Sequence, residues 1–371
     1  MSDEEPLPEV LAKPLRPGWT TGSCATAAAR AAFEALVSGL FPDPVTITLP
    51  GGQRPAFALA LTEAGDGFAR AGVVKDAGDD PDVTHGALVV ATVRRGAPGE
   101  GVTFRAGEGV GMVTRPGLPI PPGEPAINPV PRAMMRQAIA EGAEALGVAG
   151  DAIVEIAIPG GEALAAQTLN GRLGIVGGLS VLGTTGIVVP FSCAAWIHTI
   201  HRGVDVARAM GLTHVAGATG STSEAAVQRL HGLPEVALID MGDFAGGMLK
   251  YIRKHPVERV TVAGGFAKMT KLGQGLLDLH SGRGSVDLDW LAARVADAGG
   301  DEALRAAVTG ANGANDVLRL ARERGLDLPA LVAGAAWDTA ARALAGAGVA
   351  LDVVVVDRAG QVVAATAPKR V

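Results

Sequence analysis

The sequence THVAGATGSTSE at residues 213–224 opens the stretch that decides the fold, because its pattern occurs three times before residue 275. Short apolar runs at 213–217, 236–240 and 259–263 each lead into a glycine-bearing loop and then into helix-forming residues. Short buried runs that alternate with helices predict parallel strands joined by right-handed crossovers. Ligands bind beyond the carboxyl ends of the strands in such a sheet. We therefore expect a small-molecule site at that edge.

The composition is that of an ordinary globular protein, with 48% hydrophobic and 19% charged residues among 371. A chain of this length is long enough for two or three domains with cores of their own. The net charge of −6 argues against broad binding to nucleic acid or to an anionic membrane, since both require a basic face. The two cysteines, Cys24 and Cys193, are far apart and predict neither a disulfide framework nor a metal site.

The sequence also predicts a cytoplasmic protein without a membrane segment. Residues 1–10, MSDEEPLPEV, are acidic and lack the apolar core of a signal peptide. The longest apolar-looking region, 187–200, is interrupted by Pro190 and His198 and is too short to span a bilayer.

Strand patterns dominate the first half of the chain, where VTITL, AFALAL, FARAGVV and ALVVATV follow one another between residues 44 and 95. Helical patterns flank them, and the glycine-dense stretch 170–186 is typical of a hinge between halves. The predicted fold class is α/β plus α+β. The predicted parts are a flexible tail at 1–17, a mixed-sheet α+β domain at 18–175, and a Rossmann-like parallel α/β domain with a helical C-terminal part at 176–371.

The loop KDAGDDPDVT at 75–84 carries four aspartates within seven residues. Carboxylate oxygens are the ligands that Mg²⁺ and Ca²⁺ prefer, but the spacing lacks the glycine and the terminal glutamate of an EF-hand loop. Asp, Gly and Pro also dominate ordinary turns. From the residues alone, the loop is a metal site, a hydroxyl-binding site or a solvated turn.

Polar residues also follow the predicted parallel strands. Asp240 and Asp243 lie at or after the end of the second strand, where an acidic residue commonly holds a ribose diol. Ser221 and Glu224 match a capping box, which would explain the hydroxyls of that loop as a helix start alone. The glycine fingerprint Gly-x-Gly-x-x-Gly opening a helix is absent from the sequence.

Several of these stretches together resemble the cobalt-precorrin-5B C1-methyltransferase family of anaerobic corrin biosynthesis. The resemblance extends in order over nearly the whole chain, and KDAGDDPDVT together with LGTTGIV at 182–188 makes it specific. The other stretches that carry it are LRPGWTTGSCA at 15–25, AINPVPR at 126–132, LSV at 179–181, GGFAKMTK at 264–271 and HS at 280–281.

The resemblance implies S-adenosylmethionine as the methyl donor and a cobalt-bearing, ring-contracted tetrapyrrole as the acceptor. It also implies a fold unrelated to that of the usual tetrapyrrole methyltransferases, which agrees with the missing glycine fingerprint. Cobalt arrives with the substrate, so no protein metal site is implied. The Asp-rich loop would then order the site, take a proton or face the donor, because its charge repels the carboxylates of the acceptor.

With this resemblance the candidate site residues form three groups. The candidates for catalysis are Asp76, Asp79, Asp80 and His280. The candidates for binding the donor are Gly217, Gly220, Asp240, Asp243, Gly264 and Gly265. The candidates for binding the acceptor are Thr20, Thr21, Ser23, Arg132, Gly183, Thr184, Thr185, Lys268, Lys271 and Arg283.

Two other functions fit the same residues. One is a nucleotide-dependent enzyme that uses the same sheet edge, and the other is a non-catalytic carrier that shelters an unstable tetrapyrrole. Stabilisation of the protein by ATP and not by S-adenosylhomocysteine would favour the nucleotide-dependent enzyme. Corrinoid binding without methyl transfer would favour the carrier. The sequence leaves open whether the chain forms a homodimer.

Overall fold

The computed structural model describes residues 14–371 and divides the chain into two compact units, each with its own core. The first unit runs to Thr114 and then from Pro119 to Ser192, while the second holds Arg115–Leu118 and Cys193–Val371. Of the tail predicted at 1–17, residues 1–13 lie outside the described residues. Arg16, by contrast, is held in place, because its backbone N–H and its guanidinium donate hydrogen bonds to Asp79 and Asp76.

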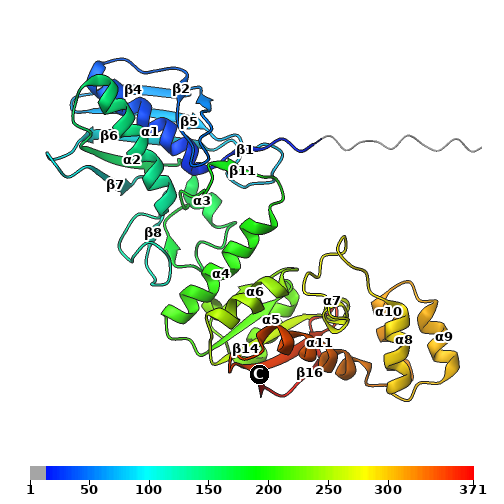
Figure 1. Cartoon of the computed structure of the whole chain (residues 1–371). Helices are drawn as coiled ribbons and strands as arrows, with labels where there is room; N and C mark the ends of the chain where they lie inside the picture. The colour runs from blue at the N-terminus through cyan, green and yellow to red at the C-terminus, as the bar shows by residue number, and fades with distance from the viewer. Residues whose placement is uncertain (1–13) are drawn as a thin grey trace, which may run out of the picture. The chain divides into compact units, whose positions relative to one another are not determined.

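The first unit contains the predicted mixed sheet, with strands in the order β4-β5-β6-β9-β7. All pairs in it are antiparallel except the parallel pair β7 and β9. Helices α1 (Thr21–Ser38) and α2 (Pro129–Leu146) pack on this sheet and on each other (Figure 1). The strands are β4 Leu61–Gly65, β5 Phe68–Val74, β6 Leu88–Arg95, β7 Val102–Ala106 and β9 Ala152–Ala157.

The glycine-dense stretch after residue 175 belongs to this first unit. Leu179 and Val181 are buried in its core, and β11 (Ile187–Val188) pairs antiparallel with β1 (Gly18–Trp19). The division between the compact units therefore lies after Ser192, whereas the sequence placed it at 175/176. The unit also contains β2 Val45–Thr46, β3 Ala56–Phe57, β8 Met112–Val113, β10 Ile175–Val176 and α3 Gly161–Ala165.

The second unit is built on a sheet of order β13-β12-β14-β15-β16, to which β17 adds by pairing with β15. Strands β12 to β15 are parallel, which confirms the three predicted parallel strands and adds β15, where the apolar run LDVVVV at 351–356 also predicts a last strand. β16 and β17 pair antiparallel with β15. The strands are β12 His214–Ala218, β13 Leu238–Asp240, β14 Arg259–Gly265, β15 Ala350–Val356, β16 Val362–Ala365 and β17 Lys369–Arg370.

Helices cover both faces of this sheet, because alternate residues of a strand point to opposite faces. Val353 and Val355 belong to the larger core cluster, while Val354 and Val356 belong to a smaller one with Val227 of α5. The helix after β12 and the helices after β14 therefore leave the sheet on opposite faces. The helices of this unit are α4 Cys193–Ala209, α5 Ser221–His231, α6 Ala245–Lys254, α7 Phe266–Gly273, α8 Leu288–Asp297, α9 Glu302–Thr309, α10 Ala314–Glu323 and α11 Leu328–Leu344, with the 3-10 turn η1 Glu235–Ala237.

From residue 14 to the C-terminus, no helix combines the length and the apolar character needed to cross a bilayer.

Candidate functional site

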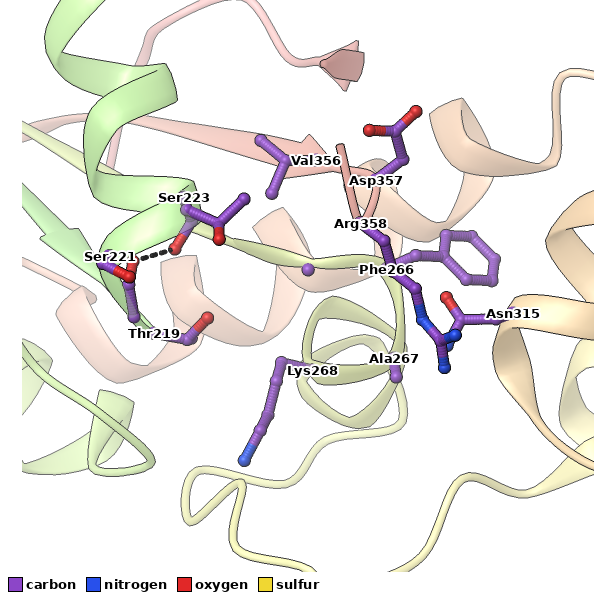
Figure 2. Close-up of a pocket in the computed structure, with 13 residues that line it drawn as sticks. Thr219, Ser221, Ser223, Phe266, Ala267, Lys268, Asn315, Val356, Asp357 and Arg358 are labelled. Carbon is purple, nitrogen blue, oxygen red and sulfur yellow. Dashed lines mark hydrogen bonds between the residues drawn. The ribbon is translucent and has the colours of Figure 1, made fainter. Parts of the chain in front are cut away.

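A cavity of about 390 Å³ opens at the carboxyl edge of the parallel sheet in the second unit (Figure 2). Small-molecule sites have volumes of roughly 300–1,000 Å³. The crevice lies where the helices after β12 and β14 diverge, which is the usual ligand position in an open parallel sheet. Its lining residues are Thr219, Gly220, Ser221, Thr222, Ser223, Gly265, Phe266, Ala267, Lys268, Asn315, Val356, Asp357 and Arg358.

Two short strand-to-helix connections form the walls of this pocket. β12 ends at Ala218 and α5 begins at Ser221, while α7 begins directly after β14. The Thr219 N–H donates to the Ala263 carbonyl at 3.0 Å and so ties the first loop to β14. The predicted capping box is wrong, because Gly220 is the cap residue and no side chain caps α5. Ser223 Oγ instead donates to the Gly220 carbonyl at 2.9 Å (Figure 2).

The four glycines predicted to bind the donor separate into two pairs. Gly220 and Gly265 line the pocket, and a Cβ added to either would meet nothing within 4 Å. Gly217 and Gly264 have a packing role, because a Cβ would lie 2.3 Å from Met248 in the first case and 2.6 Å from Met269 in the second. The Met248 side chain of α6 and the Met269 side chain of α7 thus fill the space that a side chain at these two positions would need.

The two predicted acids of the second strand differ in their surroundings. Asp243 pairs with Lys268, whose ammonium also donates to the Leu279 carbonyl at 3.2 Å. Asp240 ends β13, and its carbonyl accepts a hydrogen bond of 3.3 Å from the indole N–H of Trp196. Trp196, which the sequence analysis did not select, is therefore at the same sheet edge and is about half exposed.

The cluster His280–Arg283 is brought to this edge by backbone hydrogen bonds. Leu279 N–H donates to the Asp243 carbonyl at 2.8 Å, and Gly246 N–H donates to the Leu277 carbonyl at 2.8 Å. Lys271 is 7% exposed and donates to the Leu279 carbonyl, and burial lowers the pKa of its ammonium. Lys268 and Lys271 thus hold this loop in place.

Two candidate residues remain at the surface of that loop. His280 accepts a hydrogen bond from the Gly282 N–H on Nδ1 at 3.1 Å. The Arg283 side chain is 73% exposed, with its Nε 3.9 Å from Asp278.

Three polar residues of the pocket, Asn315, Asp357 and Arg358, lie outside the two glycine-bearing loops and were not among the candidates. Asp357 pairs with Arg322 at 3.2 Å; burial raises its pKa, but hydrogen bonds from Gln361 N–H and Arg322 outweigh burial and lower it. A usable signal was present: the last predicted strand ends at Val356, so the next two residues had to emerge at the same edge. Asn315 comes from α10, and no local pattern pointed to it.

In the first unit, the aspartates of the Asp-rich loop accept hydrogen bonds from residues of that same unit. Arg16 donates to both oxygens of Asp76, at 2.5 and 2.9 Å, and this contact lowers the pKa of Asp76 to about 2. Asp79 accepts from the Arg16 N–H at 2.6 Å, and Asp80 accepts from the Phe191 N–H at 2.8 Å.

The last aspartate of the loop, Asp82, holds the buried ammonium of Lys75 at 2.6 Å. It also accepts from the N–H and the hydroxyl of Thr84. Burial raises the pKa of Asp82, but the hydrogen bonds from Lys75 and Thr84 outweigh burial and lower it.

The candidate hydroxyls of α1 lie at its N-terminus and are buried. Thr20 caps the helix by accepting from the Ser23 N–H. Thr21 Oγ1 accepts from the Leu182 N–H at 3.0 Å, and Ser23 Oγ donates to the Gly186 carbonyl at 2.6 Å. The structure thus brings together two stretches that are about 160 residues apart in the sequence.

The LGTTG segment packs against that helix start. A Cβ on Gly183 would lie 2.3 Å from Thr20 Oγ1, and the φ of Gly183 is 132°. Thr184 and Thr185 are exposed, and Thr185 Oγ1 donates to the Ile187 carbonyl at 3.1 Å.

Arg132 is engaged within the first unit. Its guanidinium donates to the carbonyls of Ile127 and Pro125, at 2.8 and 3.1 Å, and pairs with Glu124 at 3.2 Å. Its side chain is only 17% exposed.

Within residues 14–371, no group of three or more His, Cys, Asp or Glu side chains is arranged to hold a metal ion.

Comparison with known proteins gives consistent matches over most of the chain. The family described as CbiD matches residues 9–190, and the family described as CbiD, C-terminal domain, matches residues 278–367. A cobalt-precorrin-5B C(1)-methyltransferase of Bradyrhizobium sp. is 69% identical over 95% of this chain and 94% of its own. Proteins of the same name from Agrobacterium fabrum and Methylorubrum extorquens are both 64% identical, over 95% and 94% of this chain and 93% and 97% of theirs.

A solved structure also matches, the crystal structure of the cobalamin biosynthesis protein cbiD from Archaeoglobus fulgidus. It is 28% identical and covers 72% of this chain and 83% of its own, with a TM-score of 0.39.

Proposed function

Because this chain belongs to the CbiD family, as the sequence resemblance indicated, we propose that it transfers a methyl group to C1 of cobalt-precorrin-5B in cobalamin biosynthesis. The observation that carries this function is the identity of 69% to a relative of that name over 95% of the chain. The donor is S-adenosylmethionine, and the acceptor is a cobalt-containing tetrapyrrole.

The donor binds in the pocket at the ends of β12 and β14. This position is supported by the cavity of about 390 Å³ at the point where the helices on the two faces diverge. It is also supported by the spacing from Gly220 to Asp240, because an acid about 20 residues after the glycine loop commonly binds a ribose diol. Asp240, at the end of β13, is the proposed ribose partner.

The reaction is a displacement at the sulfonium methyl group. C1 of the acceptor supplies the electron pair of the new bond, and sulfur keeps the pair of the broken C–S bond, which leaves S-adenosylhomocysteine. Holding two reactants in line can contribute up to about 7–11 kcal/mol to lowering the barrier. A carboxylate at the sulfonium would lose its attraction as the charge disappears, so it would favour the ground state and slow the step.

The remaining candidates take supporting or acceptor-binding roles. Arg283 is exposed and suited to contact the acceptor, which carries several carboxylates. The hydrogen bonds of Asp76, Asp79 and Asp80 favour a role in ordering their loop over proton transfer. Lys268 and Lys271 position the His280 loop.

Thermal unfolding with S-adenosylhomocysteine, ATP and NAD tests the donor assignment. A ligand at a hundred times its dissociation constant adds about 2.7 kcal/mol to the free energy of unfolding. We expect S-adenosylhomocysteine alone to stabilise the protein, and Asp240→Asn to weaken that effect. Labelled S-adenosylmethionine with cobalt-precorrin-5B then tests transfer. A rise in thermal stability with ATP or NAD alone would contradict the assignment of S-adenosylmethionine as the donor. Corrinoid binding without methyl transfer would indicate a carrier.

A further inference from the structure

We propose that Arg358, oriented by Asn315, receives the carboxylate of the amino-acid half of the methyl donor. This inference rests on the proposed function, since it identifies which end of the donor lies at which side of the pocket. Both residues line the cavity, and neither belongs to a stretch that carried the family resemblance.

The contact between the two side chains fixes the guanidinium in a usable orientation. The Asn315 amide is assigned by its neighbours: turned so that its oxygen faces Arg358, it accepts hydrogen bonds of 3.0 Å from Nη2 and 3.2 Å from Nε. Figure 2 shows the two side chains close together at one side of the pocket. A guanidinium has five N–H donors, so two bonds to Asn315 leave three for a ligand. Such donors match the geometry of a carboxylate.

The charges of the pocket favour an anion at Arg358. Lys268 is neutralised by Asp243 and extends away from Arg358, and Asp357 is neutralised by Arg322. Its partner Asn315 is a neutral amide, and no carboxylate within residues 14–371 forms an ion pair with Arg358. The pocket thus presents one cation whose charge nothing in its wall balances.

The order of the strands sets the orientation of the donor. Asp240 ends β13 and Arg358 follows β15, so three strand spacings separate them in the order β13-β12-β14-β15. At about 4.8 Å each, these spacings amount to about 14 Å. An extended ligand with its ribose at Asp240 therefore directs its amino-acid end across β12 and β14 toward Arg358. The reactive sulfonium then lies between the two ends, away from both side chains.

Paired titration calorimetry separates a carboxylate contact from a general effect on the pocket. The two probes are S-adenosylhomocysteine and its decarboxylated analogue, which differ only in the carboxylate. We expect Arg358→Gln to weaken binding of S-adenosylhomocysteine roughly 10- to 50-fold and to change binding of the analogue less than about twofold. Arg305→Gln is the matched control, because it removes one exposed arginine of α9 and leaves the pocket intact. Asn315→Ala should give a smaller loss in the same direction.

Three results would overturn the inference, and they are distinguishable. Equal weakening of both probes by Arg358→Gln would mean a role in pocket shape. Unchanged binding of S-adenosylhomocysteine with a raised KM for cobalt-precorrin-5B would assign Arg358 to a carboxylate of the acceptor. Failure of the wild-type protein to bind S-adenosylhomocysteine would overturn the proposed donor site itself, and the subsite with it.

Discussion

The Lys75–Thr84 loop of the first unit and the pocket of the second unit use their charges in opposite ways. In the loop, Asp76, Asp79, Asp80 and Asp82 each accept hydrogen bonds from their own unit. In the pocket, the Arg358 guanidinium is hydrogen-bonded to the neutral amide of Asn315, and the two other charged residues of the wall, Lys268 and Asp357, each pair with a residue outside the lining. A cluster of charges in the sequence therefore identifies an ordered loop as readily as a ligand site. What distinguishes the two is whether the fold already balances the charge.

The largest effect is expected from a substitution that breaks the buried ion pair between Lys75 and Asp82 in the loop. Lys75 is 1% exposed, so Lys75→Met leaves the Asp82 carboxylate without its buried partner. Breaking a buried pair from one side costs about 3–5 kcal/mol, and urea unfolding should show that loss. The double variant with Asp82→Asn should recover part of it, because no unpaired charge remains. A loss of less than about 1 kcal/mol in the free energy of unfolding would contradict the stabilising role of the Lys75–Asp82 pair.

Two glycines of the second unit sharpen the comparison between packing and ligand binding. Gly217→Ala places a Cβ 2.3 Å from Met248, and overpacking of this kind costs about 1–3 kcal/mol in stability. The matched variant Gly265→Ala adds a Cβ that meets nothing within 4 Å but stands in the pocket wall. It should leave stability within about 0.5 kcal/mol and weaken S-adenosylhomocysteine binding. If Gly217→Ala weakened ligand binding without loss of stability and Gly265→Ala did the opposite, Gly217 would be the pocket residue and Gly265 the packing residue.

The second unit also contains a network of buried polar groups around His214, and this network should make the stability of the unit depend on pH. His214 bonds to Thr261 at 2.8 Å, next to the buried Asp352, which pairs with Arg259. Burial, with the charges of Arg259 and His231, lowers the pKa of His214 to about 4, although Asp352 opposes this. The unfolded chain therefore binds a proton that the folded one does not between about pH 6.5 and 4, and stability falls as the pH falls through that window.

His214→Gln should flatten this acid limb by about 1–2 kcal/mol, allowing for the partial exposure of the ring. The measurement is urea unfolding at pH 7 and at pH 4.5. His231→Gln is the comparison variant: burial also lowers the pKa of His231, which lies 3.5 Å from Asp352, so this variant should flatten the same limb by less than His214→Gln does. If the loss of stability between pH 7 and pH 4.5 were the same in His214→Gln as in the wild-type protein, the pH dependence would come from other groups.

The smallest expected effect concerns Asp76. Because the Asp76–Arg16 pair is exposed, Asp76→Asn should cost less than about 1 kcal/mol, and any stability from the lowered pKa is lost only as the pH falls toward 2. If Asp76 only orders its own loop, the pH profile of kcat/KM should keep its shape. A shifted limb in Asp76→Asn would instead support the catalytic role that the sequence indicated.

Sequence reasoning found the regular elements well, because each depends on local pattern. The parallel strands and the mixed sheet follow from apolar runs and glycine breaks, and both are observed. It placed the domain boundary early because the glycines after residue 175 look like a linker, whereas Leu179 and Val181 are buried. It predicted a capping box at Ser221 because spacing alone cannot show which residue ends the extended chain.

The sequence by itself determined the family, the parallel strands and the edge of the sheet where the pocket opens, since these depend on residue order and periodicity. Only the tertiary structure decided which polar groups remain available there. Asn315 lies 43 residues before Arg358 in the sequence, and Lys268 meets Asp243 from a different strand-to-helix unit. Whether a charge is balanced depends on neighbours that folding brings together from distant parts of the chain, and no local pattern encodes them.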